Sequence, residues 1–156
     1  SSVTWAYATH AVIVEVDAET GKVSIQRYVV SHDAGVIINP LTAKGQILGG
    51  ICQGIGGTLL ERIVYEDGQL LTASLLDYVV PTASDTPFIE LHHVEIPTPL
   101  NVLGIKGLGE GGIIGPPAAI ANAVSDALKP IGFEANCSFI NQAEIVAALK
   151  AARAQQ

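Results

Sequence analysis

Methionine is absent from this 156-residue sequence, and cysteine, aromatic residues and positive charge are scarce. Without an initiator residue, we expect the chain to have been processed, excised or taken from something longer. The two cysteines could form a single bridge, but Cys52 falls within a predicted helix, and buried cysteine is common in cytosolic proteins. We therefore expect Cys52 and Cys137 to be reduced.

Lysine and arginine together number 8 against 15 acidic residues, which gives a net charge of −7. Nucleic-acid binding needs clustered positive charge, so the sequence argues against a nucleic-acid partner. No apolar run approaches the roughly 20 residues that span a bilayer, and no signal-like segment opens the chain. These absences predict a soluble, cytoplasmic protein with no membrane span.

Apolar bulk and glycine are plentiful, with 49% hydrophobic residues and 16 glycines. This content suffices for the core of one domain, which we expect to comprise residues 1–156. Valine and isoleucine patterns over 10–17 and 22–30, joined by a short polar loop, predict a β-hairpin. Further β-structure is predicted as a hairpin over 63–72 and strands over 88–96 and 102–105.

A long helix is predicted over 41–62, although its many glycines weaken it intrinsically. A glycine face would let another backbone or a flat ligand approach closely. Gln46 and Gln53 lie on one face, although surface glutamines on a tightly packed helix are the alternative. Helices are also predicted over 118–128 and 141–152, the latter with a capping box. The fold class is therefore α+β, with hairpins and a mixed sheet packed against these helices.

The stretch 106–122 is the most unusual part of the sequence, because Glu110 stands among glycines just before a helix. Spacing alone leaves two interpretations open, an exposed loop or a site where a large ligand meets the backbone. The pattern G-x-G-x-x-G fits Gly107 to Gly112, but it stands late in the chain and leaves little of it for a nucleotide-binding sheet. A carboxylate shielded from water by a ligand could serve as a general base near neutral pH.

Other catalytic arrangements find little support. His92 and His93 are neighbours on a predicted strand and point to opposite faces, so they cannot bind one ion together. His32 and Asp33 form a better pair but lack further ligands at suitable spacing. There is no G-x-S-x-G motif, and neither cysteine has a nearby histidine, so nucleophilic hydrolysis is unsupported.

The stretch from Lys106, KGLGEGG followed by IGPPAAIANAVSDAL, closely resembles the end of the molybdopterin-binding large subunit of the molybdenum hydroxylases. That family includes xanthine dehydrogenases, aldehyde oxidoreductases and aerobic carbon monoxide dehydrogenases. Further stretches resemble the same subunit in the same order: HDAGVIINP over 32–40, GQILGGICQGIG over 45–56 and LDYVVPT over 76–82. The resemblance spans essentially the whole chain.

The resemblance implies a role for particular residues. Glu110 would be the general base beside molybdenum, and Gln46 would hydrogen-bond the pterin. The backbone of Gly107, Leu108 and Gly109 would approach the cofactor. The implied reaction oxidises or hydroxylates an aldehyde, N-heterocycle or similar small substrate, such as carbon monoxide, with oxygen derived from water.

The implied cofactor is molybdenum–molybdopterin, with the cytosine dinucleotide among its forms, and partner chains or domains would carry iron–sulfur clusters and FAD. The family's large subunit is several times longer and contains further cofactor-binding segments that are missing here. We therefore expect a C-terminal segment, or a small chain of a split enzyme, that is inactive until other chains or segments complete the site. The alternative is a non-catalytic assembly or binding module that retains the fold.

Overall fold

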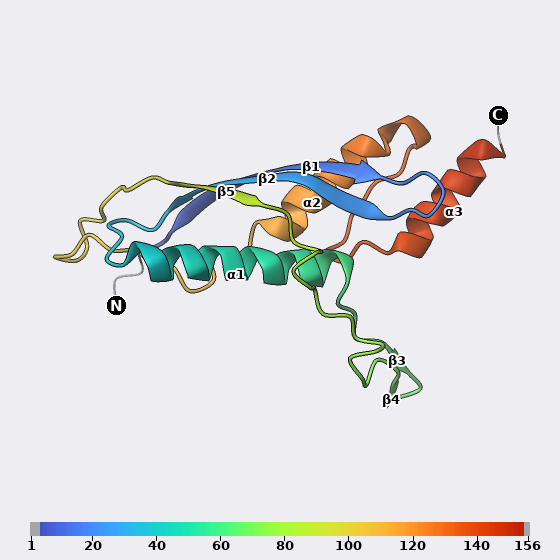
Figure 1. Cartoon of the computed structure of the whole chain (residues 1–156), viewed down its shortest axis with the longest axis horizontal. Helices are drawn as coiled ribbons and strands as arrows, with labels where there is room; N and C mark the ends of the chain where they lie inside the picture. The colour runs from blue at the N-terminus through green and yellow to red at the C-terminus, as the bar shows by residue number, and fades with distance from the viewer. Residues whose placement is uncertain (1–3, 155–156) are drawn as a thin grey trace.

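A long antiparallel hairpin of β1 (Tyr7–Val16) and β2 (Val23–Asp33) forms the centre of the computed structural model, which describes residues 4–154 (Figure 1). Its turn is stabilised by Asp17, whose carboxylate accepts backbone hydrogen bonds from Glu19 and Thr20 at 2.9 and 2.7 Å. Strand β5 (Ile89–His93) pairs in parallel with β2 and completes a three-stranded sheet in the order β1-β2-β5. The predicted hairpin is confirmed, and both of its strands are longer than expected.

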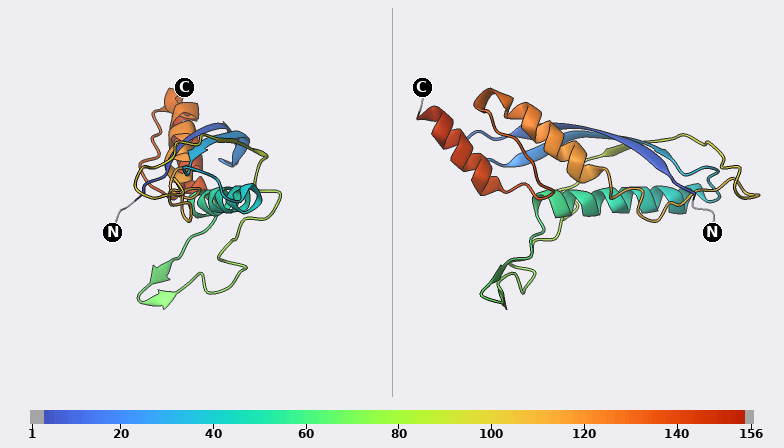
Figure 2. Two further views of the ribbon diagram at one scale, coloured as in Figure 1. Left: turned by 90° about the vertical axis from the view of Figure 1, so that its left-hand side faces the viewer. Right: turned by 180° about the vertical axis from the view of Figure 1, so that it is seen from behind.

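Helix α1 (Pro40–Leu59) runs beneath the sheet, and α2 (Pro116–Ala127) packs against both β1 and α1 (Figure 2). Asn39 starts α1 by accepting hydrogen bonds from the N–H groups of Leu41 and Thr42. The core lies between these helices and one face of the sheet. Its fully buried aliphatic and aromatic side chains include Tyr28, Val30, Ile47, Ile51, Ile55, Ile120, Val124 and Ile145.

The C-terminal part of the chain closes one end of the sheet. After α2 come a short 3-10 helix, η1 (Lys129–Ile131), and α3 (Gln142–Arg153), which places Ile145 in the core. The Asn141 side chain accepts a hydrogen bond from the N–H of Ala143 at 3.0 Å. The expected reciprocal bond from Glu144 to the Asn141 backbone does not form; instead the two side chains meet at 3.5 Å.

An arm formed by residues 61–80 projects away from this body, and the chain returns to α1 at Pro81 (Figures 1 and 2). It contains a small ladder of β3 (Tyr65–Glu66) and β4 (Gln69–Leu70), shorter than the hairpin expected over 63–72. The arm's large apolar side chains face outward, with Leu75 and Leu76 exposed by 79% and 88%. The arm therefore contributes little to the core of the segment.

Two expected strands differ in the structure. The strand predicted over 88–96 is limited to β5, and the one over 102–105 is reduced to a single bridge between Gly35 and Ile105. Gly104 has a φ of 66°, and Asn101 bonds both backbone groups of Ile105, so this segment is a turn. No helix in residues 4–154 combines the length and apolar character needed to cross a membrane.

Candidate functional site

The glycine-rich stretch from Lys106 to Gly112 is an irregular loop attached at both ends. At its start, the Lys106 N–H donates to the Ala34 carbonyl at 2.8 Å and the Gly107 N–H to the Thr4 carbonyl at 3.1 Å. At its end, Gly112 lies directly on the backbone of α1, where a β-carbon would collide with the carbonyl oxygen of Ile47. The loop therefore bridges from the sheet to the helix.

Gln46 connects the helix to the middle of this loop. It lies on α1 and donates a hydrogen bond from Nε2 to the carbonyl oxygen of Gly109 at 2.6 Å. Since Glu110 follows Gly109 directly, the bond fixes the backbone immediately before the carboxylate. The structure thus brings together Gln46, Gly109 and Glu110, three of the residues predicted for the site.

A cleft of about 230 Å³ lies between α1 and the loop. Gln53 borders it as well as Gln46, so the expectation that the two amides share a face is confirmed. Gly107 and Leu108 do not line this cleft; they lie with Glu110 along a second cavity on the other side of the loop. Glu110 borders both spaces, and its side chain has no hydrogen-bond partner among the described residues.

The glycines of α1 divide into two groups. A β-carbon on Gly50 or Gly54 would come within 3.0 or 2.7 Å of the Gly112–Pro116 segment, so these glycines permit close packing of loop and helix. Gly45 and Gly49, in contrast, border the cleft, and a β-carbon on either would meet nothing within 4 Å. Gly109 is equally open.

This open, side-chain-free surface fits one edge of a flat, polar cofactor such as a pterin, since amide groups and peptide backbone are what its ring edges could bond. About 230 Å³ is too small for a whole pterin dinucleotide, because pockets for ligands of that size generally exceed roughly 300 Å³. The residues present therefore fit part of such a group, and further protein is needed to enclose it.

Asp33 and Lys106 form an ion pair beneath the loop, an interaction that the sequence did not reveal. Their side chains are only 7% and 8% exposed. Burial alone would raise the pKa of Asp33, but hydrogen bonds from Lys106 and from the N–H groups of Gly35 and Ile96 outweigh it and hold this pKa below its usual range. Asp33 is thus a structural anion at neutral pH.

Successive side chains of a strand point to opposite faces, so His32 and Asp33 at the end of β2 do not form a ligand pair. No group of three or more histidine, cysteine, aspartate or glutamate side chains is placed to hold a metal ion within the described chain. His32 is fully buried and lies against Gly111, where any β-carbon would overlap the imidazole. The only sign of the contact between Gly111 and His32 in the sequence is that a glycine, rather than a larger residue, follows Glu110.

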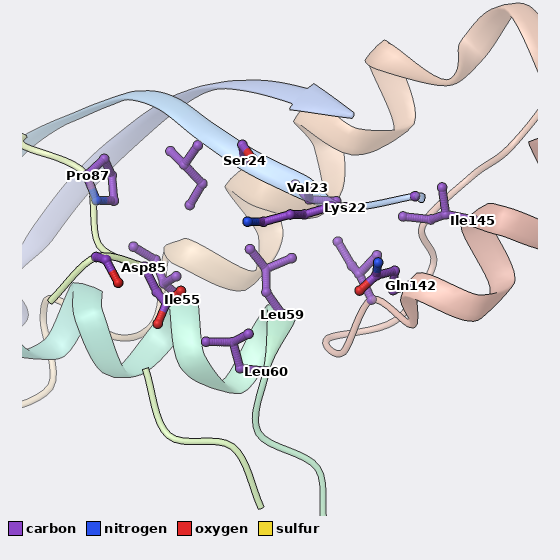
Figure 3. Close-up of a pocket in the computed structure, with 14 residues that line it drawn as sticks. Lys22, Val23, Ser24, Ile55, Leu59, Leu60, Asp85, Pro87, Gln142 and Ile145 are labelled. Carbon is purple, nitrogen blue, oxygen red and sulfur yellow. The ribbon is translucent and has the colours of Figure 1, made fainter. Parts of the chain in front are cut away.

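A separate pocket of about 260 Å³ lies at the far end of α1 (Figure 3). The end of α1 forms one side, with Leu59 and Leu60, and the hairpin turn and α3 form others. In Figure 3 the Lys22 side chain extends from the hairpin into the space above Leu59, and Asp85 lies on the side of Ile55. None of the residues predicted for the site borders it, so the pocket is distinct from the glycine loop.

Comparisons with known proteins bear on this site. Residues 1–87 match the family model described as the molybdopterin cofactor-binding domain. The nicotine 6-hydroxylase large subunit of Paenarthrobacter nicotinovorans is 48% identical over 124 residues, which cover 79% of this chain and 15% of that protein. The gamma subunit of the 6-hydroxypseudooxynicotine dehydrogenase complex from the same organism is 45% identical over 130 residues, which cover 82% and 16%.

Among solved structures, quinoline 2-oxidoreductase from Pseudomonas putida 86 superimposes with a TM-score of 0.84 and 42% identity over 90% of this chain. The match covers 18% of that protein's chain, so the segment spans less than a fifth of the length of each of these relatives. On the family match and these similarities, the chain belongs to the molybdopterin cofactor-binding domain family of the molybdenum hydroxylase large subunits.

Proposed function

We propose that this chain is a segment of the molybdopterin-binding subunit of a molybdenum hydroxylase and supplies Glu110 as its general base. The observation that carries the proposal is the hydrogen bond from Gln46 to the Gly109 carbonyl. It holds the carboxylate-bearing loop over an open glycine surface, as a base beside a large cofactor requires. Gln46 and the backbone of Gly109, which border the cleft, would hold one edge of the pterin, whereas Gly107 and Leu108, predicted for the same role, lie on the other side of the loop.

The cofactor, when bound, supplies the two-electron redox chemistry. Overall, such a hydroxylation converts R–H and water into R–OH with release of two protons and two electrons. Glu110 would accept one of these protons on its carboxylate and later release it to solvent. The two electrons would leave through iron–sulfur and FAD partner chains or domains, as the multisubunit character of the relative named as a complex supports.

The substrate class is a small molecule, and relatives named for nicotine and quinoline favour an N-heterocycle over an aldehyde. Because each relative is several times longer than this segment, most of the substrate pocket and of the cofactor site would come from the remainder of the subunit. Residues 1–156 would then be one domain-sized part of that subunit.

The test is Glu110→Gln in the complete enzyme. The amide matches the carboxylate in size but cannot accept a proton at neutral pH, so turnover should fall by about 10²- to 10⁴-fold. Molybdenum content, measured by metal analysis, should remain unchanged. Turnover equal to that of the unmodified enzyme would contradict the role of Glu110 and favour a non-catalytic assembly module.

A further inference from the structure

The arm formed by residues 61–80 exposes large apolar side chains along most of its length. Leu75 and Leu76 are 79% and 88% exposed, and five others are exposed by 44% to 65%: Ile63, Tyr65, Leu71, Val79 and Val80. Single apolar residues scattered over a surface are normal, but a concentration of this kind marks an interaction site. None of these side chains borders the cleft beside Glu110, so the cofactor site does not account for them.

Leu75 and Leu76 lie between the hydrogen-bonded ends of a turn. The Tyr78 N–H donates to the Ser74 carbonyl at 2.8 Å, and the Ser74 hydroxyl donates to the Asp77 carboxylate at 2.7 Å. The Asp77 N–H also donates to the Ser74 carbonyl, at 3.1 Å. The turn therefore presents two adjacent leucines on a backbone that is already ordered.

The β3–β4 half of the arm is ordered in the same way. The Leu71 N–H donates to the Val64 carbonyl at 2.9 Å, and the Val64 N–H donates to the Thr72 hydroxyl at 3.1 Å. Asp67 and Gly68 have φ values of 48° and 82°, which a tight hairpin turn requires. An arm that is ordered before it meets a partner loses little conformational entropy on binding, which favours association.

Contacts at the root hold the arm to the end of α1. The Tyr78 hydroxyl donates to the Glu61 carboxylate at 2.5 Å and closes the arm across its base. A β-carbon on Gly56 would collide with both Pro81 and the Glu61 carboxylate, so a glycine lets the chain leave and return at this point. The stretch LDYVVPT over 76–82 has no role in the cofactor site. It contains an exposed leucine together with side chains that fix the position of the arm.

The charges on the arm indicate the chemistry of the surface that it meets. Residues 63–80 contain three acidic side chains, Glu66, Asp67 and Asp77, and no lysine, arginine or histidine. The complementary surface is therefore apolar at its centre and basic at its rim. A second copy of this chain matches such a surface poorly, because it carries the same excess of acidic over basic residues, 15 against 8.

The length of the related subunits indicates where that surface lies. The matched regions make up 15% and 16% of two relatives, so more than four fifths of such a subunit lies outside this segment. The arm projects away from the segment's own core (Figures 1 and 2). The protein that covers the arm therefore belongs outside the segment, and the remainder of the same subunit is its largest neighbour.

We propose that the arm docks into an apolar hollow, bordered by lysine or arginine, on the remainder of the molybdopterin-binding subunit, with Leu75 and Leu76 as its anchors. The inference rests on the proposed function, which makes this chain a segment of that subunit. Because the arm follows directly on α1, docking also orients the helix that carries Gln46. The α1 side of the cofactor cleft is thereby positioned relative to the residues that complete it.

The experiment uses the assembled enzyme carrying Leu76→p-benzoylphenylalanine, whose side chain bonds covalently to neighbouring C–H groups on irradiation. A denaturing gel separates the products, and mass spectrometry identifies the joined peptides. We expect a cross-link to a peptide of the molybdopterin-binding subunit outside residues 1–156. An unirradiated sample of the same enzyme is the control.

A second measurement follows assembly directly. Leu75→Asp combined with Leu76→Asp should reduce the fraction of the subunit found in the complete enzyme by about 10-fold or more, because docking would remove two carboxylates from water. Both leucines are exposed within the segment, so aspartate at these positions leaves its core undisturbed. Leu75→Met with Leu76→Met should preserve assembly. Gln69→Glu, which adds a negative charge at an exposed polar position of the arm, should preserve it as well. Native mass spectrometry measures the assembled fraction.

A cross-link to a second copy of the subunit would overturn the inference, and so would one to an iron–sulfur or FAD chain, or none at all. Normal assembly of the double aspartate variant would overturn it too. Failure of the proposed function is distinguishable through Glu110→Gln. Loss of turnover in that variant, with the arm cross-linked elsewhere, would remove the docking alone. Full turnover with the expected cross-link would remove only the role of Glu110.

Discussion

Lys106 and Asp33, 73 residues apart in sequence, form an ion pair that joins the end of β2 to the first residue of the loop carrying Glu110. Asp33 also accepts hydrogen bonds from the Gly35 N–H at 2.8 Å and the Ile96 N–H at 3.1 Å. One carboxylate thus ties together three segments of chain. The position of the candidate base depends on this junction as well as on Gln46.

Lys106→Met should destabilise the protein by about 3 kcal/mol, because it leaves the Asp33 carboxylate buried without its cation. The measurement is the free energy of unfolding in urea. Lys44→Met, at an exposed position of α1, is the matched control and should change that free energy by less than about 0.5 kcal/mol. Equal effects of the two substitutions would show that the ion pair does not anchor the loop.

Gln46→Ala should loosen the loop while leaving the fold intact. The substitution removes the hydrogen bond to the Gly109 carbonyl, which contributes about 1 kcal/mol. Hydrogen exchange of the amides from Gly109 to Gly111 should accelerate by about 5-fold, as that free energy implies. Gln53→Ala, which alters the same cleft but no hydrogen bond of the described chain, should leave the exchange rates unaltered.

Replacing Gly54 or Gly57 of α1 by alanine should change the free energy of unfolding in opposite directions. Gly54→Ala would bring a methyl group to 2.7 Å from the ring of Pro116, so we expect destabilisation by about 1–3 kcal/mol. Gly57→Ala points into open space on the same helix and should stabilise by about 0.5–1 kcal/mol. Thermal unfolding of the two variants measures the difference, and shifts of the same sign would contradict the packing described for α1.

The free energy of unfolding should decrease as the pH falls below about 6.5, the usual pKa of histidine. The pKa values of His10 and His32 are lowered in the folded protein, chiefly by burial, so the unfolded chain takes up protons first and unfolding becomes more favourable. Urea unfolding at pH 7.5 and 5.5 measures the loss. His32→Phe should reduce this pH dependence, whereas His92→Phe, which removes an exposed ring, should preserve it.

Much of the fold was predictable because its signals are local. The alternation of Val12, Val14 and Val16 places these residues on the core face of β1, and α1 begins at Pro40, one residue before the predicted start. The prediction of a strand over 102–105 was wrong, although the residues there are mostly apolar. The Asn101 side chain bonds both backbone groups of Ile105, and Gly104 adopts a left-handed conformation, so the segment forms a turn.

The candidate site was predictable only in part. Gln46 and Glu110 stand in motifs, so the family resemblance identified them, and the structure brings both to one cleft. The Lys106–Asp33 pair links distant segments through tertiary packing, which no local pattern encodes. The burial of His32 was not predicted. Neighbouring residues in a strand point to opposite faces, and the sequence around His32 does not show which face is covered by other segments.

The projecting arm has a consequence for handling the protein. Leu75 and Leu76 are 79% and 88% exposed, and the small β3–β4 ladder cannot shelter them. Exposed apolar segments of this kind promote aggregation when a polypeptide is held apart from the surface that normally covers it. Expression of residues 1–156 alone should therefore yield a self-associating product, and charged substitutions at Leu75 and Leu76 are the direct route to a monodisperse sample.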